Sequence, residues 1–151
     1  MIEVLEHSSH EVALQIHAVF QQSYRTEAEL IGIQNFPPLL RAAEQIQNAG
    51  REFLGLRIDS ELTAIVEYKL DGAQLSIDSL VVHPSFFRRG LASQLLRSLL
   101  DENEWQNADV ETAVANRPAI SLYRKFGFSK FKRWKTAEGI EKVQLLIQKL
   151  S

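Results

Sequence analysis

The chain has 151 residues, of which 45% are hydrophobic and 24% charged, with a formal net charge of −2 and no cysteine. This length and composition indicate one globular domain spanning residues 1–151, and they exclude a disordered chain. The missing cysteine excludes disulfides, thiolate metal sites and a covalent acyl-cysteine intermediate, while the near-neutral charge gives no overall attraction to nucleic acid or anionic lipid.

Hydrophobic periodicity predicts four helices and seven strands. In chain order we expect a strand over Ile2–Leu5, helices over Ser9–Tyr24 and Leu40–Asn48, strands over Glu52–Ile58, Leu62–Leu70 and Gln74–Val82, a long helix from Gly90, a strand over Asp109–Val114, a helix from Asn116 that Gly127 ends, and strands over Phe128–Thr136 and Ile140–Lys149. The three central strands follow one another as an antiparallel meander. The fold class is therefore α/β (α+β), with a mixed sheet covered by helices.

The N-terminal part carries two local signals. Ser8-Ser9-His10-Glu11 predicts a capping box at the start of the first helix. Pro37 and Pro38 exclude a helix interior, so we expect Arg25–Phe36 to be an ordered connector or two short helical pieces. The N-terminal segment has no basic stretch followed by an apolar run, and no stretch approaches the ~18 apolar residues of a membrane span, so we expect a cytoplasmic protein with no membrane contact.

The turn between Val82 and Ala92 is the first candidate site. A helix that begins Arg-Arg-Gly-Leu-Ala presents unpaired backbone N–H groups and the positive end of its dipole, and small residues let a phosphate approach them. Arg88 and Arg89 add positive charge. The pattern is neither a P-loop nor a dinucleotide fingerprint, so on its own it predicts only a generic phosphate site.

The residues from Ile77 to Pro84, followed by Arg88-Arg89-Gly90-Leu91-Ala92, resemble the CoA-binding motif of the GNAT superfamily of N-acetyltransferases. That motif has the form Gln/Arg-x-x-Gly-x-Gly/Ala. Gly90 and Ala92 match its small positions, and Phe87 stands where the family has Gln or Arg.

A second motif supports the same resemblance. Asn116, Ala119 and the run Leu122-Tyr123-Arg124-Lys125-Phe126-Gly127-Phe128 resemble the family pattern Asn-x-x-Ala-x-x-x-Tyr-x-x-x-Gly-Phe. The resemblance implies a GNAT-like, mostly antiparallel sheet of about seven strands covered by about four helices. It also implies an acyl-CoA-dependent N-acyltransferase that takes acetyl-CoA as co-substrate.

The resemblance implies which residues hold the cofactor. The strand before the turn would bond the pantetheine arm, the helix start would bind the pyrophosphate, and an amide N–H at Val81, give or take one residue, would polarise the thioester carbonyl. The cofactor residues so implied are Leu80, Val81, Val82, Arg88, Arg89, Gly90, Leu91, Ala92, Ser93, Asn116, Tyr123 and Lys125. Asn116 is also expected to cap its helix.

Two side chains are assigned to catalysis. Tyr123 matches the tyrosine that the family often uses as general acid toward the departing thiolate. Asp78 is our candidate for taking the proton from the acceptor amine, directly or through a water, and Glu67 on the neighbouring strand is the reserve. Because the chain has no cysteine, direct transfer in a ternary complex is favoured over a ping-pong route. The four histidines show no metal-ligand spacing, so no metal is expected.

The acceptor is expected to be the primary amine of a small molecule. Its binding site is expected to be lined by Tyr24 to Leu39, where Glu27 and Glu29 could attract a cationic amine. A homodimer is left open. One alternative is a non-catalytic CoA-binding or regulatory module with this fold. Another, a nucleic-acid surface, is disfavoured because Glu138, Glu141 and the net charge offset its basic and aromatic residues, which are Arg124, Lys125, Lys130, Phe131, Lys132, Arg133, Trp134 and Lys135.

Overall fold

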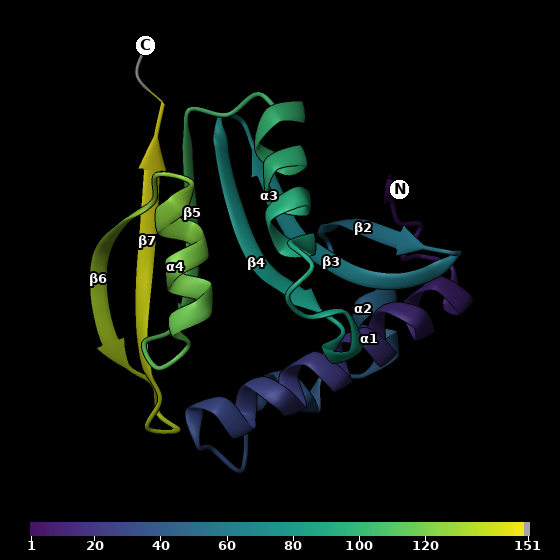
Figure 1. Cartoon of the computed structure of the whole chain (residues 1–151), viewed down its shortest axis with the longest axis horizontal. Coiled ribbons are helices and arrows are strands. Elements are labelled where there is room, and N and C mark those ends of the chain that lie inside the picture. Colours follow the sequence, from purple (N-terminus) through teal and green to yellow (C-terminus); the bar gives the residue numbers. More distant parts are fainter. Residues whose placement is uncertain (150–151) are drawn as a thin grey trace.

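The structure, a computed structural model that describes residues 1–149, contains one open seven-stranded sheet with the strand order β1-β2-β3-β4-β5-β7-β6 (Figure 1). Every neighbouring pair is antiparallel except β4 and β5, which are parallel. The elements are β1 (Ile2–Val4), α1 (His10–Ile31), the 3₁₀ helix η1 (Pro37–Leu40), α2 (Ala43–Gln47), β2 (Glu52–Ile58), β3 (Glu61–Asp71), β4 (Gln74–Val82), the 3₁₀ helix η2 (Pro84–Phe86), α3 (Leu91–Glu102), β5 (Asn107–Ala113), α4 (Arg117–Lys125), β6 (Ser129–Lys135) and β7 (Glu141–Gln148).

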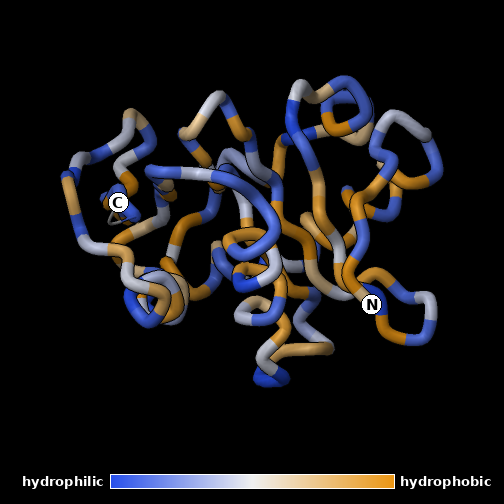
Figure 2. The backbone as a smooth tube through the Cα atoms, turned by 90° about the horizontal axis from the view of Figure 1, so that it is seen from above, coloured by the Kyte–Doolittle hydropathy of each residue, from blue (hydrophilic) through white to orange (hydrophobic). Residues whose placement is uncertain are grey.

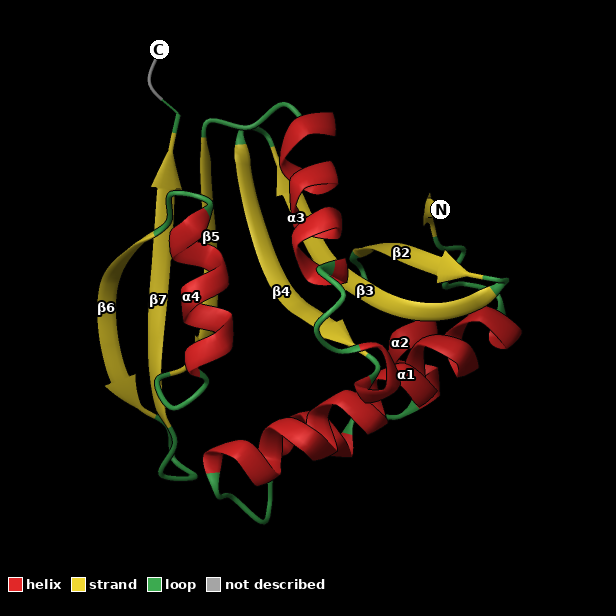
Figure 3. Ribbon diagram, in the orientation of Figure 1, coloured by secondary structure: helices red, strands yellow, loops and turns green. Residues whose placement is uncertain are grey.

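Helices cover both faces of the sheet, in three layers (Figure 3). Leu54, Val66 and their like-facing neighbours pack with α3 and α4, while Phe53 and Ile65, which point the other way, pack with α1 and α2. This division follows from the two-residue period of a strand. In Figure 2 much of the hydrophilic sequence lies in the peripheral loops, and the strands between them are largely hydrophobic.

The sheet opens between its two parallel strands. β4 and β5 pair only from Gln74 with Asn107 to Ile77 with Val110, and beyond these residues they diverge (Figure 1). At the same point the β3–β4 register shifts, which leaves Asp78 as an extra residue on β4. Such a bulge bends its strand, so β4 turns away from β5 and a cleft forms at the centre of the sheet.

The first helix is longer than the sequence predicted. α1 runs to Ile31, so the expectation of a connector from Arg25 was wrong over residues 25–31. The stop signal is Gly32 with φ 73°, whose neighbour Ile33 donates its N–H back to the Ala28 carbonyl at 3.0 Å. The prolines act later, in η1, and the buried Ala28 continues the apolar stripe that begins with Ala13.

Other local predictions had mixed outcomes. The expected capping box is absent, because the N-cap residue Ser9 makes no side-chain cap bond. The second helix is shorter than expected, since η1 takes its first residue and α2 begins only at Ala43. The cap of α4 is confirmed: Asn116 Oδ1 accepts the Ala119 N–H at 3.3 Å. The meander and the last hairpin are also confirmed, with strand ends within two residues of the predicted ones.

Candidate active site

A turn with two left-handed residues joins β4 to α3. Arg88 has φ 65° and Gly90, the N-cap of α3, has φ 71°. A Cβ placed on Gly90 would meet nothing within 4 Å, so the space above the helix start is open. The start of α3, whose first-turn N–H groups have no partner within the helix, lines the same open space as Arg88, as the phosphate argument requires.

This turn forms one wall of a cavity of about 410 Å³ in the cleft between β4 and α4. The cavity brings together all the predicted cofactor residues except Arg89 and Lys125, which lie outside its wall. The Arg89 guanidinium is instead over the Phe86 ring, 5.1 Å from its centroid. Sequence reasoning missed the wall contributed by α1, which consists of Ser23, Thr26, Glu27 and Leu30. A correct prediction of the end of α1 would have found it.

The free edge of β4 offers backbone donors to this cavity. His83 donates its N–H to the Thr63 carbonyl at 2.8 Å, so the alternation of an antiparallel ladder also directs Val81 toward β3. The same alternation directs the N–H groups of Leu80 and Val82 toward β5, beyond the last β4–β5 pair. The donor that the sequence placed within one residue of Val81 is thus available at Leu80 and at Val82.

A second cavity, of about 480 Å³, lies on the other side of the cleft, between α1, η1 and the open end of the sheet. Tyr24, Phe36 and Pro38, from the segment predicted to line the acceptor site, line this cavity. The two cavities share five lining residues: Glu27, Leu80, Asn116, Ala119 and Tyr123. A ligand in one cavity therefore meets a ligand in the other at these side chains.

Tyr123 is the phenol at this junction. Its side chain is buried and its ring packs edge-on against Phe128, with centroids 5.6 Å apart. Burial, with smaller contributions from the nearby Tyr24 and Glu27, raises the pKa of Tyr123 well above its usual value. The hydroxyl therefore stays protonated at neutral pH and can act as a proton donor.

Glu27 is the only carboxylate among the shared residues. Burial raises its pKa above the usual range for a glutamate, although a hydrogen bond with Asn116 and the charge of Lys142 act in the opposite direction. An acid with a raised pKa beside a buried phenol is a pair that acid–base chemistry uses. The sequence offered Glu27 only as an attractor of cations.

Asp78 and Glu67, the carboxylates singled out from the sequence, both have arginine partners. Asp78, on the bulge, lines the second cavity and pairs with Arg51 at 2.6 Å. Its pKa is raised, chiefly by burial, although the hydrogen bond and the charge of Arg51 act in the opposite direction. Glu67 is buried and accepts hydrogen bonds from both terminal nitrogens of Arg41, at 2.6 and 2.8 Å. Both oxygens of Glu67 are thereby occupied.

A hydrogen-bonded chain connects the buried Glu67 to the second cavity. Tyr24 donates its hydroxyl to Ser79 Oγ at 2.7 Å, and Ser79 lies 3.4 Å from Glu67 Oε1. Burial raises the pKa of Tyr24, so it too stays protonated. The chain fixes the Tyr24 ring in the cavity wall.

The family model of the acetyltransferase (GNAT) family matches residues 15–128, which include both motifs and every residue that lines the first cavity. The chain belongs to this family. Its mixed, mostly antiparallel sheet with four helices is the fold of the GNAT enzymes.

Two relatives share substantial sequence with the chain. The UPF0157 protein YqkA of Bacillus subtilis is 38% identical over 141 residues, which cover 93% of this chain and 41% of that protein. The [ribosomal protein bS18]-alanine N-acetyltransferase of Salmonella typhimurium is 35% identical over 89 residues, 54% of this chain and 59% of that one. The chain thus spans less than two thirds of the length of either curated relative.

Solved structures of low identity share the fold. The ribosomal-protein-S18-alanine N-acetyltransferase of Escherichia coli has a TM-score of 0.77 at 18% identity, over 98% of this chain and 92% of that one. The PaiA N-acetyltransferase of Thermoplasma acidophilum, solved in complex with coenzyme A, has a TM-score of 0.71 at 19% identity, over 95% of this chain and 98% of that one.

Residues 1–149 contain neither a membrane-spanning helix nor a cluster of metal ligands. No helix in this part of the chain is both long and apolar enough to cross a bilayer. No group of three or more His, Asp or Glu side chains is placed there to hold a metal ion.

Proposed function

We propose that this acetyltransferase moves an acetyl group from acetyl-CoA to a primary amine by direct transfer in a ternary complex. The observation that carries the proposal is the junction: two cavities of comparable size enter the cleft from opposite sides and meet at Leu80, Asn116 and Tyr123. One cavity suits the donor and the other the acceptor, and both substrates can be present together.

The first cavity fits the chemistry of acetyl-CoA. The N–H groups at the start of α3 and the Arg88 guanidinium suit a pyrophosphate, while the free N–H groups of Leu80 and Val82 suit the amides of a pantetheine arm. Phe87, in place of the family's Gln or Arg, lines the cavity and is 44% exposed. Phosphate binding therefore rests on backbone groups and on Arg88.

The residues at the junction supply the proton transfers. The amine nitrogen attacks the thioester carbonyl carbon, the carbon–sulfur bond breaks, and the Leu80 N–H, which faces both cavities, polarises the carbonyl. Glu27 takes the proton that the nitrogen loses, and Tyr123 gives its proton to the thiolate. Asp78 is the second candidate for the base; it lines the acceptor cavity but not the first cavity.

Calorimetry with acetyl-CoA and thiol release with a panel of amines test the proposal. The panel includes small amines, polyamines, amino acids and peptide N-termini, the last because two relatives are alanine N-acetyltransferases of a ribosomal protein. We expect micromolar binding and release of CoA with at least one amine. Failure to bind contradicts the proposal, and binding without any release supports a non-catalytic CoA-binding module instead.

A further inference from the structure

Phe87, which stands where the family motif has Gln or Arg, is exposed although its neighbour Phe86 is anchored. Phe86 is partly buried, packs against the apolar core and has the Arg89 guanidinium 5.1 Å from its ring centroid. Phe87 is 44% exposed, and within residues 1–149 no aromatic ring or cation is stacked on it. Phe86 therefore supports the turn, whereas much of the Phe87 ring is left uncovered.

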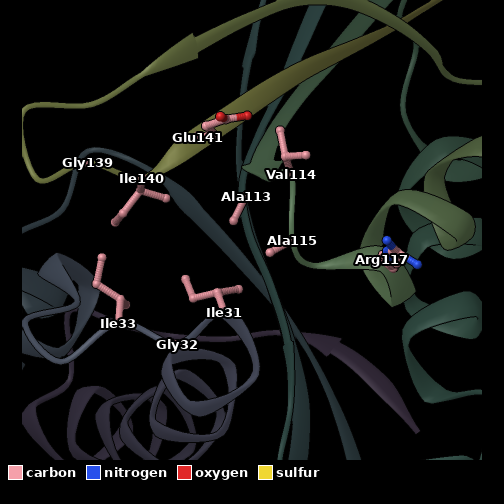
Figure 4. Close-up of a pocket in the computed structure, with 10 residues that line it drawn as sticks. All are labelled: Ile31, Gly32, Ile33, Ala113, Val114, Ala115, Arg117, Gly139, Ile140 and Glu141. Carbon is pink, nitrogen blue, oxygen red and sulfur yellow. The ribbon is translucent and has the colours of Figure 1, made fainter.

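The uncovered ring lies on the wall of the first cavity. Of the eight large apolar side chains exposed in the described part of the chain, only Leu30 and Phe87 line this cavity, and none lines the second. Leu30 lies near the end of α1, and the next residue, Ile31, lines a separate pocket of about 470 Å³ together with Ile140 (Figure 4). Exposed apolar side chains beside a cavity mark a surface that a ligand covers.

The position of Phe87 along the cavity indicates which part of acetyl-CoA it meets. With the thioester at the junction and the pyrophosphate at the start of α3, the adenosine is the next group beyond Gly90. Phe87 precedes Gly90 by three residues, which span at most about 10 Å. The base is joined to the pyrophosphate through a single ribose, so it is within reach of the ring. The acetyl group is not, since Phe87 does not line the second cavity.

Adenine is also the part of the cofactor whose chemistry suits a phenyl ring. The base is flat and uncharged and has an exposed π face, whereas the phosphates need positive charge and backbone donors. The Phe87 N–H is donated to the Pro84 carbonyl at 3.3 Å, and the following Arg88 is left-handed, with φ 65°. The backbone on both sides of the ring is thus ordered, which lowers the entropy cost of stacking.

We propose that the Phe87 ring stacks on the adenine base of acetyl-CoA. The proposal rests on the proposed function, because it needs acetyl-CoA in the first cavity with its pyrophosphate at the start of α3. It explains the departure from the motif: this chain has an aromatic contact to the nucleotide at the position where the family has a polar side chain.

Binding measurements that need no acceptor test the proposal. Calorimetry gives the Kd of acetyl-CoA for wild type, Phe87→Ala and Phe87→Tyr. We expect the Kd to rise about tenfold in Phe87→Ala, the size of effect that loss of one stacked base has, and to stay unchanged in Phe87→Tyr, which keeps the ring. Because the phenyl ring carries no charge, the ratio of the two Kd values should be the same at about 0.05 and about 0.5 M salt.

A second ligand and NMR show whether the base is the group involved. S-acetyl-4′-phosphopantetheine has the arm and one phosphate but no adenosine, so its Kd should be the same for wild type and Phe87→Ala. The two ring protons of adenine should move upfield when acetyl-CoA binds wild type or Phe87→Tyr, because they then lie over an aromatic ring, and much less with Phe87→Ala. Phe131→Ala is the matched control, since Phe131 is 66% exposed on β6 and lines neither cavity.

The outcomes separate this proposal from the proposed function. An unchanged Kd of acetyl-CoA in Phe87→Ala overturns the stacking and leaves acetyl transfer intact. An equal loss of affinity for both ligands also overturns it, because Phe87 then contacts the arm or shapes the turn. A loss that disappears at high salt does the same, since it reports on Arg88. Failure of the wild-type protein to bind acetyl-CoA overturns both.

Discussion

Tyr123 is positioned to act as an acid, because its hydroxyl lies where the two cavities meet and its raised pKa keeps it protonated. A free thiol has a pKa near 8.5, so protonation of the leaving group helps without being indispensable. We expect Tyr123→Phe to lower kcat roughly 100-fold, the low end for general acid–base catalysis, with little change in the Kd of acetyl-CoA. Steady-state kinetics and calorimetry measure the two quantities.

Tyr68→Phe is the control for this prediction. Tyr68 is also buried and burial also raises its pKa, yet it lines neither cavity. It should keep the wild-type rate. If Tyr123→Phe does so as well, the acid is another group.

Glu27 should set the acidic limb of the pH–rate profile. A base must be ionised to accept a proton, so kcat/KM should fall as pH decreases through the raised pKa of Glu27, above the usual range for glutamate. In Glu27→Gln this limb should disappear together with most of the activity.

The stability of the fold should depend on pH in the opposite direction. Because burial disfavours the ionised Glu27 carboxylate, the stability that the protonated form contributes is lost as pH rises through the same pKa. Glu27→Gln should therefore melt at a higher temperature than wild type at neutral pH.

Two further variants complete the test of Glu27. Glu29→Gln changes an exposed glutamate two residues along the same helix, and its profile should match that of wild type. Asp78→Asn should lower the rate only modestly. If the acidic limb disappears in Asp78→Asn and persists in Glu27→Gln, Asp78 is the base.

Among the structural elements, the segment between α1 and β2 is attached to the sheet by the ion pair of the half-buried Arg41 with the buried Glu67. Arg41→Met leaves the Glu67 carboxylate, 3% exposed, without its partner, and should destabilise the fold by about 3–5 kcal/mol. The double variant with Glu67→Gln should recover most of this loss, because no buried charge remains. Urea unfolding measures both.

A surface pair provides the comparison. Arg57 and Glu3 also form an ion pair, but the Glu3 side chain is 41% exposed, so Arg57→Met should cost only about 0–1 kcal/mol. Equal losses in Arg41→Met and Arg57→Met would show that the Glu67 carboxylate finds another partner when Arg41 is removed.

How far the sequence predicts these elements depends on the range of the interactions that form them. The turn at Gly90 and the cap at Asn116 are local, so their residues could be read from spacing alone. The signal that ends α1, Gly32, is also local, but the sequence prediction ended the helix earlier because of the prolines at 37 and 38. The junction at Glu27 was not predictable in this way.

Glu27 becomes a candidate base only because α1 crosses the cleft between two diverging strands. That divergence depends on a bulge at Asp78 and on a β4–β5 register that ends at Ile77, and neither is encoded by a local motif. The pairing of Arg41 with Glu67, 26 residues apart, likewise depends on tertiary packing. Because of these interactions, Glu67 forms a structural ion pair and Asp78 lies in a cavity wall, which the sequence alone did not indicate.

At the scale of the whole molecule, the cleft divides the sheet into β1–β4 and β5–β7, joined by four paired residues on each parallel strand. Acetyl-CoA in its cavity would contact β4, α1 and α3 on one side of the cleft and α4, which follows β5 in the chain, on the other. Binding to the folded state alone stabilises it, by about 2.7 kcal/mol at 100 times the Kd. For a chain of this size we therefore expect a rise in Tm of roughly 5–10 °C.

Hydrogen exchange would show whether this stabilisation comes from closing the cleft. If the cofactor bonds the free edge of β4, the amides of Leu80 and Val82 should gain protection, while those of β6, at the outer edge of the sheet, should exchange at an unchanged rate. S-acetyl-pantetheine, which lacks the pyrophosphate, should protect the same two amides but raise Tm less, because it cannot reach the start of α3. Uniform protection, or protection at the turn without Leu80 and Val82, would contradict the assignment of the β4 edge to the pantetheine arm. Both ligands carry the same pantetheine arm. The difference between the Tm rise with acetyl-CoA and the Tm rise with S-acetyl-pantetheine therefore measures the contribution of binding at Gly90 and its neighbours.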